Sequence, residues 1–173
     1  RPPTPDPLTP RNPSMRIVLL IILAFILQSF ISGLLGEALA PPDLIYLATL
    51  MSVTVVSPYA GLPLAFGIGL VQDLLSAGYP GLHAVGLLFA AYAYYQLTRL
   101  VHWDELAGQL VVLVGSFIAK WAGYLLIAFW LKLGPFNPLT LWPVMLSEMV
   151  LTLLLAPWVI GRYQRLVGVM RRE

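Results

Sequence analysis

The sequence predicts an all-α integral membrane protein with six transmembrane helices. Of its 173 residues, 59% are hydrophobic and only 10% are charged, whereas a soluble domain carries roughly 25% charged residues. The apolar residues fall into six segments separated by short polar, proline-containing or glycine-containing turns. Because a helix needs about 20 mainly apolar residues to cross a bilayer, this chain has room for about five to seven crossings and little else.

The first apolar segment covers about residues 16–36 and follows a proline-rich leader. Residues 1–14 contain six prolines and are expected to stay extended or disordered on the cytoplasmic side. Ala38-Leu39-Ala40 resembles a signal-peptide cleavage site. The apolar run exceeds the roughly 7 to 15 residues of a signal peptide, and Pro41 follows directly, so we expect a retained helix.

The other five segments complete a transmembrane domain over residues 15–161. The second spans about 43–57 and ends at the turn SPYAGLP, and the third ends in VQDLLS. The last three cover about 82–101, 108–131 and 139–161. Residues 162–173 follow as a basic tail that is expected to lie in the cytoplasm.

The basic residues predict the orientation, because cytoplasmic flanks attract Lys and Arg. With six crossings both termini share a side, and that side holds Arg1, Arg11, Arg16, Arg99, Arg162, Arg165, Arg171 and Arg172. The opposite side holds Lys132 alone. Both termini are therefore predicted to be cytoplasmic. The arginines cluster at helix ends and not along one face, so we expect no nucleic-acid binding. The absence of cysteine excludes disulfides and thiol ligands.

Two predicted helices carry small residues at every fourth position, which favours close helix packing in a membrane. The two stripes are Gly61, Ala65 and Gly69, and Gly115, Ala119 and Gly123. Asp73 continues the first stripe by one more step of four, so helical geometry directs it toward a packed neighbour and not toward lipid. The stripes are candidates for packing within the chain or against a partner helix.

Lys120 and Glu148 lie deep in the fifth and sixth predicted helices, at roughly 13 to 18 Å from the membrane surface. A charge at that depth costs on the order of 2.5 to 3.5 kcal/mol. The two helices are consecutive and antiparallel, so we predict a Lys120–Glu148 ion pair, or at least mutual facing. The alternative is that both residues line a substrate or ion path.

Two further pairs could carry chemistry. Ser116 and Lys120 could form a nucleophile pair, although no oxyanion loop accompanies them. Asp73 and His83 could form an acid–base pair, or Asp73 could bond the glycine-rich turn with His83 at a helix start. His83 and His102 are assigned to opposite membrane sides and cannot share a metal ion. We expect no catalytic, cofactor or metal site.

Two stretches carry a family resemblance. PDLIYLATL, followed by AFGIGLVQDLLSAGYPGLHAVGLLFAAYAYY, resembles the rod shape-determining protein MreD family. The motif covers about residues 42–95, and the six-helix layout is similar from Met15 onward. The sequence departs from the family pattern at Ala77, where glycine is usual; Gly78 follows.

This resemblance implies a non-enzymatic, multi-pass scaffold of the bacterial inner membrane. It would bind MreC and work with MreB, RodA and a penicillin-binding transpeptidase in the cell-elongation complex that directs sidewall peptidoglycan synthesis. Anionic lipid could contact the leader and tail. The implied fold is similar to the S components of energy-coupling-factor transporters. A second hypothesis is therefore a small-molecule or lipid-precursor carrier, with a cavity lined by groups such as Asp73, His83, Lys120 and Glu148.

Overall fold

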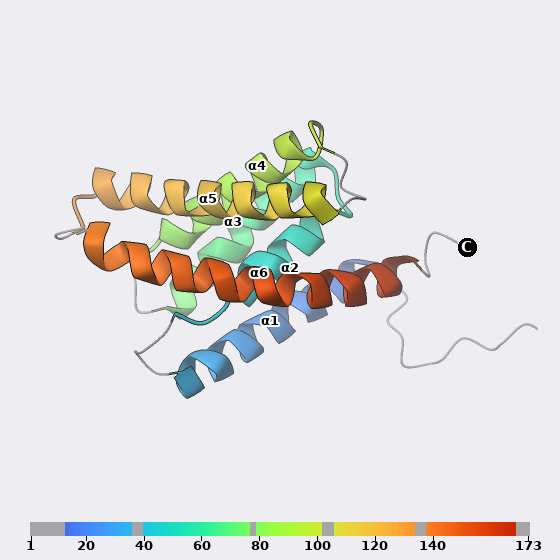
Figure 1. Cartoon of the computed structure of the whole chain (residues 1–173), viewed down its shortest axis with the longest axis horizontal. Helices are drawn as coiled ribbons and strands as arrows, with labels where there is room; N and C mark the ends of the chain where they lie inside the picture. The colour runs from blue at the N-terminus through green and yellow to red at the C-terminus, as the bar shows by residue number, and fades with distance from the viewer. Residues whose placement is uncertain (1–12, 36–39, 77–78, 102–105, 134–137, 169–173) are drawn as a thin grey trace, which may run out of the picture.

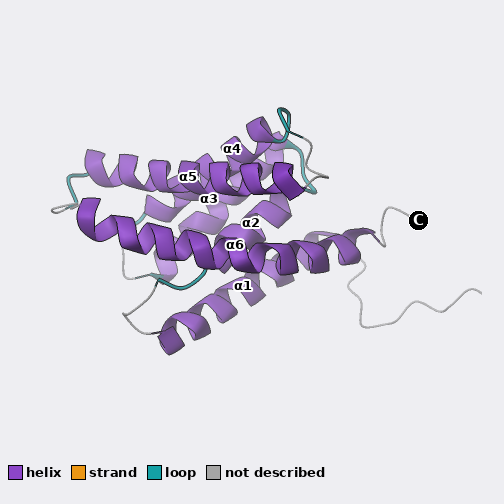
Figure 2. Ribbon diagram, viewed as in Figure 1, coloured by secondary structure: helices purple, strands orange, loops and turns teal. Residues whose placement is uncertain are grey.

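The computed structural model of the chain is helical throughout its regular parts. It describes residues 13–35, 40–76, 79–101, 106–133 and 138–168. The helices are α1 (Pro13–Leu35), α2 (Leu44–Val53), α3 (Pro58–Leu75), α4 (Leu82–Leu97), α5 (Leu106–Trp130) and α6 (Pro138–Gly168). None of the described residues forms a strand (Figure 2). Most of the leader, Ala77, His102 and the last residues of the tail lie outside the described residues.

Successive helices run in alternating directions (Figure 1). The start of α1 and the end of α6 consequently lie at the same end of the bundle. The loops between α2 and α3 and between α4 and α5 also lie at this end (Figure 1). This arrangement is the one that six antiparallel segments require. The cytoplasmic location of that end remains a prediction.

Three helices are long and apolar enough to cross a membrane, over Ile17–Leu35, Ala107–Trp130 and Leu141–Arg162. These are α1, α5 and α6. The second segment is shorter than predicted, because α2 has only 10 residues and rises about 15 Å. That is about half of a 30 Å hydrocarbon core. The structure therefore supports a membrane protein, while six full crossings remain a prediction.

Several other helix boundaries differ from the predicted ones: α1 begins at Pro13, within the predicted leader, and α4 ends at Leu97 instead of about residue 101. The stretch SPYAGLP, expected to be a turn, belongs mostly to α3: Ser57 is its N-cap and Pro58 takes the first helical position, where a missing N–H costs nothing. Pro63 consequently lies inside the helix. The helix α6 continues to Gly168, so residues 162–168 of the predicted tail are helical.

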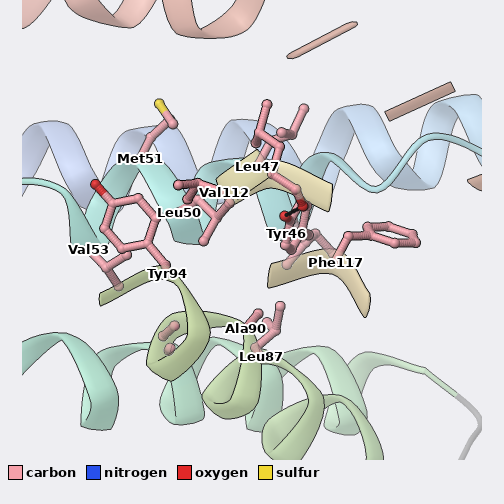
Figure 3. Close-up of a cluster of buried hydrophobic side chains, with 14 of the residues drawn as sticks. Tyr46, Leu47, Leu50, Met51, Val53, Leu87, Ala90, Tyr94, Val112 and Phe117 are labelled. Carbon is pink, nitrogen blue, oxygen red and sulfur yellow. Dashed lines mark hydrogen bonds between the residues drawn. The ribbon is translucent and has the colours of Figure 1, made fainter. Parts of the chain in front are cut away.

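The helix α2 forms the centre of the hydrophobic core. Every residue from Ile45 to Val53 is buried. Its side chains meet those of α4 and α5 in one cluster (Figure 3), which includes Tyr46, Leu50, Leu87, Ala90, Val112 and Phe117. The rings of Tyr46 and Phe117 pack edge to face with centroids 5.4 Å apart. The short helix is thus enclosed by the other helices of the bundle.

The small-residue stripe of α3 packs against α4. Gly61 lies against the ring of Tyr95, and Ala65 is fully buried. At Gly69 the two backbones approach so closely that a Cβ atom would lie 2.5 Å from the Cα atom of Ala84. This stripe is therefore occupied by packing within the chain.

The stripe of α5 packs against the other side of α4. Gly115 lies against Leu97, and a Cβ atom on Gly123 would lie 3.0 Å from the ring of Phe89. Ala119 is half-buried between them. The α3–α4 and α4–α5 interfaces are the most extensive in the bundle. Close packing of small residues, which holds helices together where lipid gives no hydrophobic drive, is thus concentrated around α4.

We expect the substitution Gly69→Ala to destabilise the folded protein by about 1–3 kcal/mol, because the added methyl group meets backbone that cannot rotate away. Gly67→Ala is the matched control on the same helix, since a Cβ atom there has nothing within 4 Å. The substitution Gly67→Ala should leave the free energy of unfolding unchanged or raise it by up to about 1 kcal/mol. Thermal unfolding of the purified variants in detergent measures both effects. Equal unfolding temperatures for the two variants would contradict the close α3–α4 approach.

Candidate functional site

A buried cluster of three charged residues joins α2, α5 and α6. The ammonium nitrogen of Lys120 lies 2.6 Å from Oδ2 of Asp43 and 2.6 Å from Oε1 of Glu148. Lys120 and Asp43 are buried, and Glu148 is nearly so. Pairing of this kind is what permits charges to remain in a membrane interior. We call Asp43, Lys120 and Glu148 the charged cluster.

Asp43 also holds the start of α2 in place. Its Oδ1 atom accepts a hydrogen bond from the backbone N–H of Tyr46 (2.8 Å) and thereby caps the helix. Its own N–H donates to the hydroxyl of Thr152 on α6 (2.8 Å). The N–H of Leu44 donates to the amide oxygen of Gln28 on α1 (2.8 Å). Three neighbouring helices therefore fix the position of this helix end.

Aromatic side chains complete the surroundings of Lys120. Its ammonium group lies 4.5 Å from the ring centroid of Phe117 and 5.6 Å from that of Trp121, distances at which cation–π attraction operates. The indole N–H of Trp121 donates to Oε2 of Glu148 (3.0 Å). Both carboxylate oxygens of Glu148 are thus hydrogen-bonded. With all three groups ionised, two carboxylates surround one ammonium and leave one negative charge in excess.

The Lys120–Glu148 pair predicted from the depth of the two residues is present in the structure. Sequence reasoning missed Asp43 as the second carboxylate. The motif PPD at a helix start is typical of a cap at the membrane surface, and Asp43 does cap α2. Asp43 begins a helix of only 10 residues, and its place beside Lys120 depends on how the neighbouring helices hold α2, which spacing along the sequence does not show.

A second polar site links the end of α3 to the start of α4. The carboxylate of Asp73 is fully buried and accepts hydrogen bonds from the backbone N–H groups of Gly81 (2.8 Å), His83 (2.9 Å) and Ala84 (3.1 Å). Nδ1 of His83 also lies 2.8 Å from Oδ1 of Asp73. The first N–H groups of a helix have no partner within it. Asp73 therefore caps α4 from the neighbouring helix.

Of the two hypotheses for Asp73 and His83, this geometry matches the capping of the glycine-rich turn. Gly81 adopts a left-handed conformation (φ +102°), which glycine accepts without strain. The ring of His83 packs edge to face on Tyr124, with centroids 5.6 Å apart. Because Nδ1 is bonded to Asp73, Nε2 is the ring nitrogen that remains for another partner.

Ser116 and Lys120 have separate hydrogen-bond partners. The hydroxyl of Ser116 lies 2.5 Å from the carbonyl oxygen of Val112 on its own helix and 2.8 Å from the hydroxyl of Tyr46. Tyr46 in turn donates to the carbonyl of Leu113 (2.7 Å). The ammonium of Lys120 points to the carboxylates. Ser116 thus joins α2 to α5 in this structure.

A cavity of about 240 Å³ lies beside the charged cluster. Residues of α1, α3, α4, α5 and α6 and of the segment before α2 line it. The polar lining is Gln28, Asp43, Gln72, His83, Lys120 and Glu148, and the aromatic lining is Trp121 and Tyr124. Three of the four residues expected around a ligand are therefore present, whereas Asp73 is not among the lining residues. Within the described ranges, no group of three or more His, Cys, Asp or Glu side chains could hold a metal ion.

Comparison with known proteins identifies one family. The model of the family described as rod shape-determining protein MreD matches residues 12–166. No curated protein and no solved structure matches the chain. The similarity to transporter S components accordingly remains an expectation.

Proposed function

The chain belongs to the rod shape-determining protein MreD family, and from this premise we propose that it is a non-enzymatic scaffold of the cell-elongation complex in the bacterial inner membrane. The observation that carries the proposal is the family match, which extends over residues 12–166 and so covers nearly the whole chain. The hydroxyl of Ser116 bonds to its own helix, and we propose that it takes no part in catalysis. Ser116→Ala should therefore keep cells rod-shaped.

The proposed direct partner is an MreC-like protein with a single transmembrane helix, and MreB, RodA and a penicillin-binding transpeptidase would join the larger complex. Together they would direct sidewall peptidoglycan synthesis. The two small-residue stripes are covered by α4, so a partner helix needs another surface. We propose the outer face of α1, which packs chiefly on α2. Its exposed apolar side chains include Val18, Leu19, Ile22, Leu23, Ile26, Phe30 and Leu34.

Affinity purification in mild detergent tests this contact. The substitution Phe30→Ala removes a large exposed ring from α1, and we expect it to lower recovery of the MreC-like partner about tenfold, the effect of roughly 1.4 kcal/mol. Phe129→Ala is the matched control, because Phe129 is an exposed ring on α5. It should leave recovery unchanged. Full recovery with both variants would exclude this face of α1, and failure of the wild-type chain to recover the partner would contradict the scaffold itself.

The cavity favours a second candidate function, the binding of a small molecule or lipid precursor within the membrane. Pockets that bind ligands combine apolar and aromatic walls with a few polar groups, and this cavity has both. A ligand that remains bound through purification would support it. Scaffolding and ligand binding use different parts of the chain, so one protein can carry both.

A further inference from the structure

The cavity has an electrostatic preference for a cation. With both carboxylates ionised, Asp43 and Glu148 share the single ammonium of Lys120, and the charged cluster then carries one negative charge in excess. An uncompensated charge in a membrane interior is costly, and a bound cation relieves that cost. Among the described lining residues, Lys120 is the only Lys or Arg. Because two carboxylates already pair with the ammonium of Lys120, an anionic ligand would find no unpaired positive charge among these residues.

Two acceptors are available to such a cation. Each oxygen of Glu148 accepts one hydrogen bond from the protein, and a carboxylate oxygen can accept two. The side chain of Glu148 is 15% exposed, against 6% for Asp43, so Glu148 is the accessible carboxylate. The side chain of His83 is 33% exposed. When the ring is neutral and Nδ1 donates to Asp73, Nε2 is an acceptor.

The aromatic wall also suits a cation. Trp121 and Tyr124 line the cavity with ring centroids 5.5 Å apart and planes inclined at 52°. Faces of Trp and Tyr attract ammonium groups. The ammonium of Lys120 already lies 5.6 Å from the centroid of Trp121, which shows that a positive charge is accommodated beside this ring.

The size of the cavity limits the ligand to a small group. Its volume of about 240 Å³ is below the roughly 300–1,000 Å³ of sites that enclose drug-sized molecules. We infer that the cavity binds a primary ammonium group, carried either by a small free amine or by the headgroup of an aminophospholipid. The inference rests on the second candidate function, and it stands independently of partner binding through α1.

The test uses the full chain in lipid nanodiscs. In discs of mixed phosphatidylethanolamine and phosphatidylcholine, native mass spectrometry of the released protein should show phosphatidylethanolamine enriched about tenfold, which is the discrimination of one charge-assisted contact. The quaternary ammonium of phosphatidylcholine has no N–H to donate. In discs of phosphatidylcholine alone, added ethanolamine should raise the unfolding temperature.

Two variants separate binding from folding. Glu148→Gln removes the accessible charge but leaves Lys120 paired with Asp43, and Val144→Trp fills the cavity without altering a charge. Both should abolish the enrichment and the ethanolamine effect. Val150→Trp is the control, because Val150 is a similarly exposed residue of α6 that does not line the cavity. It should behave as the wild type.

Each outcome decides between sources or against the inference. If phosphatidylethanolamine is enriched with the wild type but not with Glu148→Gln or Val144→Trp, the lipid headgroup is the source of the ammonium group. Stabilisation by ethanolamine without lipid enrichment supports a free amine. If neither effect occurs, or if Glu148→Gln and Val144→Trp keep both effects, the inference is wrong. Recovery of the MreC-like partner, measured on the same preparation, then shows whether the scaffold proposal survives.

Discussion

Replacing Lys120 with methionine is expected to destabilise the folded protein by about 3–5 kcal/mol, the usual cost of removing one partner of a buried ion pair. Methionine keeps most of the side-chain length, so packing against Phe117 is largely retained. The loss comes from Asp43 and Glu148, which would face each other as two carboxylates without a counter-ion. Thermal or denaturant unfolding in detergent, together with the yield of folded protein, measures this effect.

Neutralising the carboxylates should reverse most of this loss. In the triple variant Asp43→Asn, Lys120→Met and Glu148→Gln no charge remains in the cluster, and the amide oxygen at position 43 can still cap α2 through Tyr46. Replacing all partners of a buried pair is often nearly neutral. Lys132→Met is the surface control, because Lys132 is exposed, and it should change stability by less than about 0.5 kcal/mol. If the triple variant is as unstable as Lys120→Met alone, the effect is one of shape and not of charge.

The substitution Asp73→Ala should have a similarly large effect. It removes the acceptor of three backbone N–H groups and of the His83 ring. A buried donor without a partner costs about 1–3 kcal/mol, so the sum should reach about 3 kcal/mol or more. Asp73→Asn should also destabilise the protein, because its NH₂ group would face N–H donors. The unfolding temperature should fall, and amide hydrogen exchange should accelerate first at the start of α4.

A neighbouring residue provides the control for Asp73. The hydroxyl of Ser76 donates to the backbone carbonyl of Asp73 (3.2 Å) from an exposed position. Ser76→Ala should therefore change stability by less than about 0.5 kcal/mol. Unchanged hydrogen exchange at the start of α4 in Asp73→Ala would mean that other groups cap this helix.

The sequence predicted those contacts that follow from position along a single helix. The step of four from Gly69 placed Asp73 on the packed side of α3, and the similar depths of Lys120 and Glu148 predicted their pair. Asp43 could not be found in this way, because its depth depends on where other helices hold α2. The contact between Asp43 and Lys120 depends on the tertiary structure and cannot be deduced from spacing along the sequence.

The small-residue stripes show the same limit. Their period of four predicts a close helix contact, but it does not say which helix approaches, or whether that helix belongs to the same chain. The structure gives α4 as the neighbour of both Gly69 and Gly123. The prolines of SPYAGLP are typical of a turn, but Pro58 takes the first helical position of α3 and Pro63 lies inside the helix.

The bond between Asp43 and Lys120 joins residues 77 positions apart, and this separation constrains membrane insertion during synthesis. The helix α1 is long and apolar enough to cross the bilayer. When the ribosome has completed α2, however, the counter-ion of Asp43 has not yet been made, and an unpaired carboxylate in lipid is unfavourable. The short α2 should therefore settle into the bilayer only after α5 emerges. A nascent chain stalled after α4 should accordingly be a target for quality-control proteolysis, whereas one stalled after α5 has the lysine that Asp43 requires.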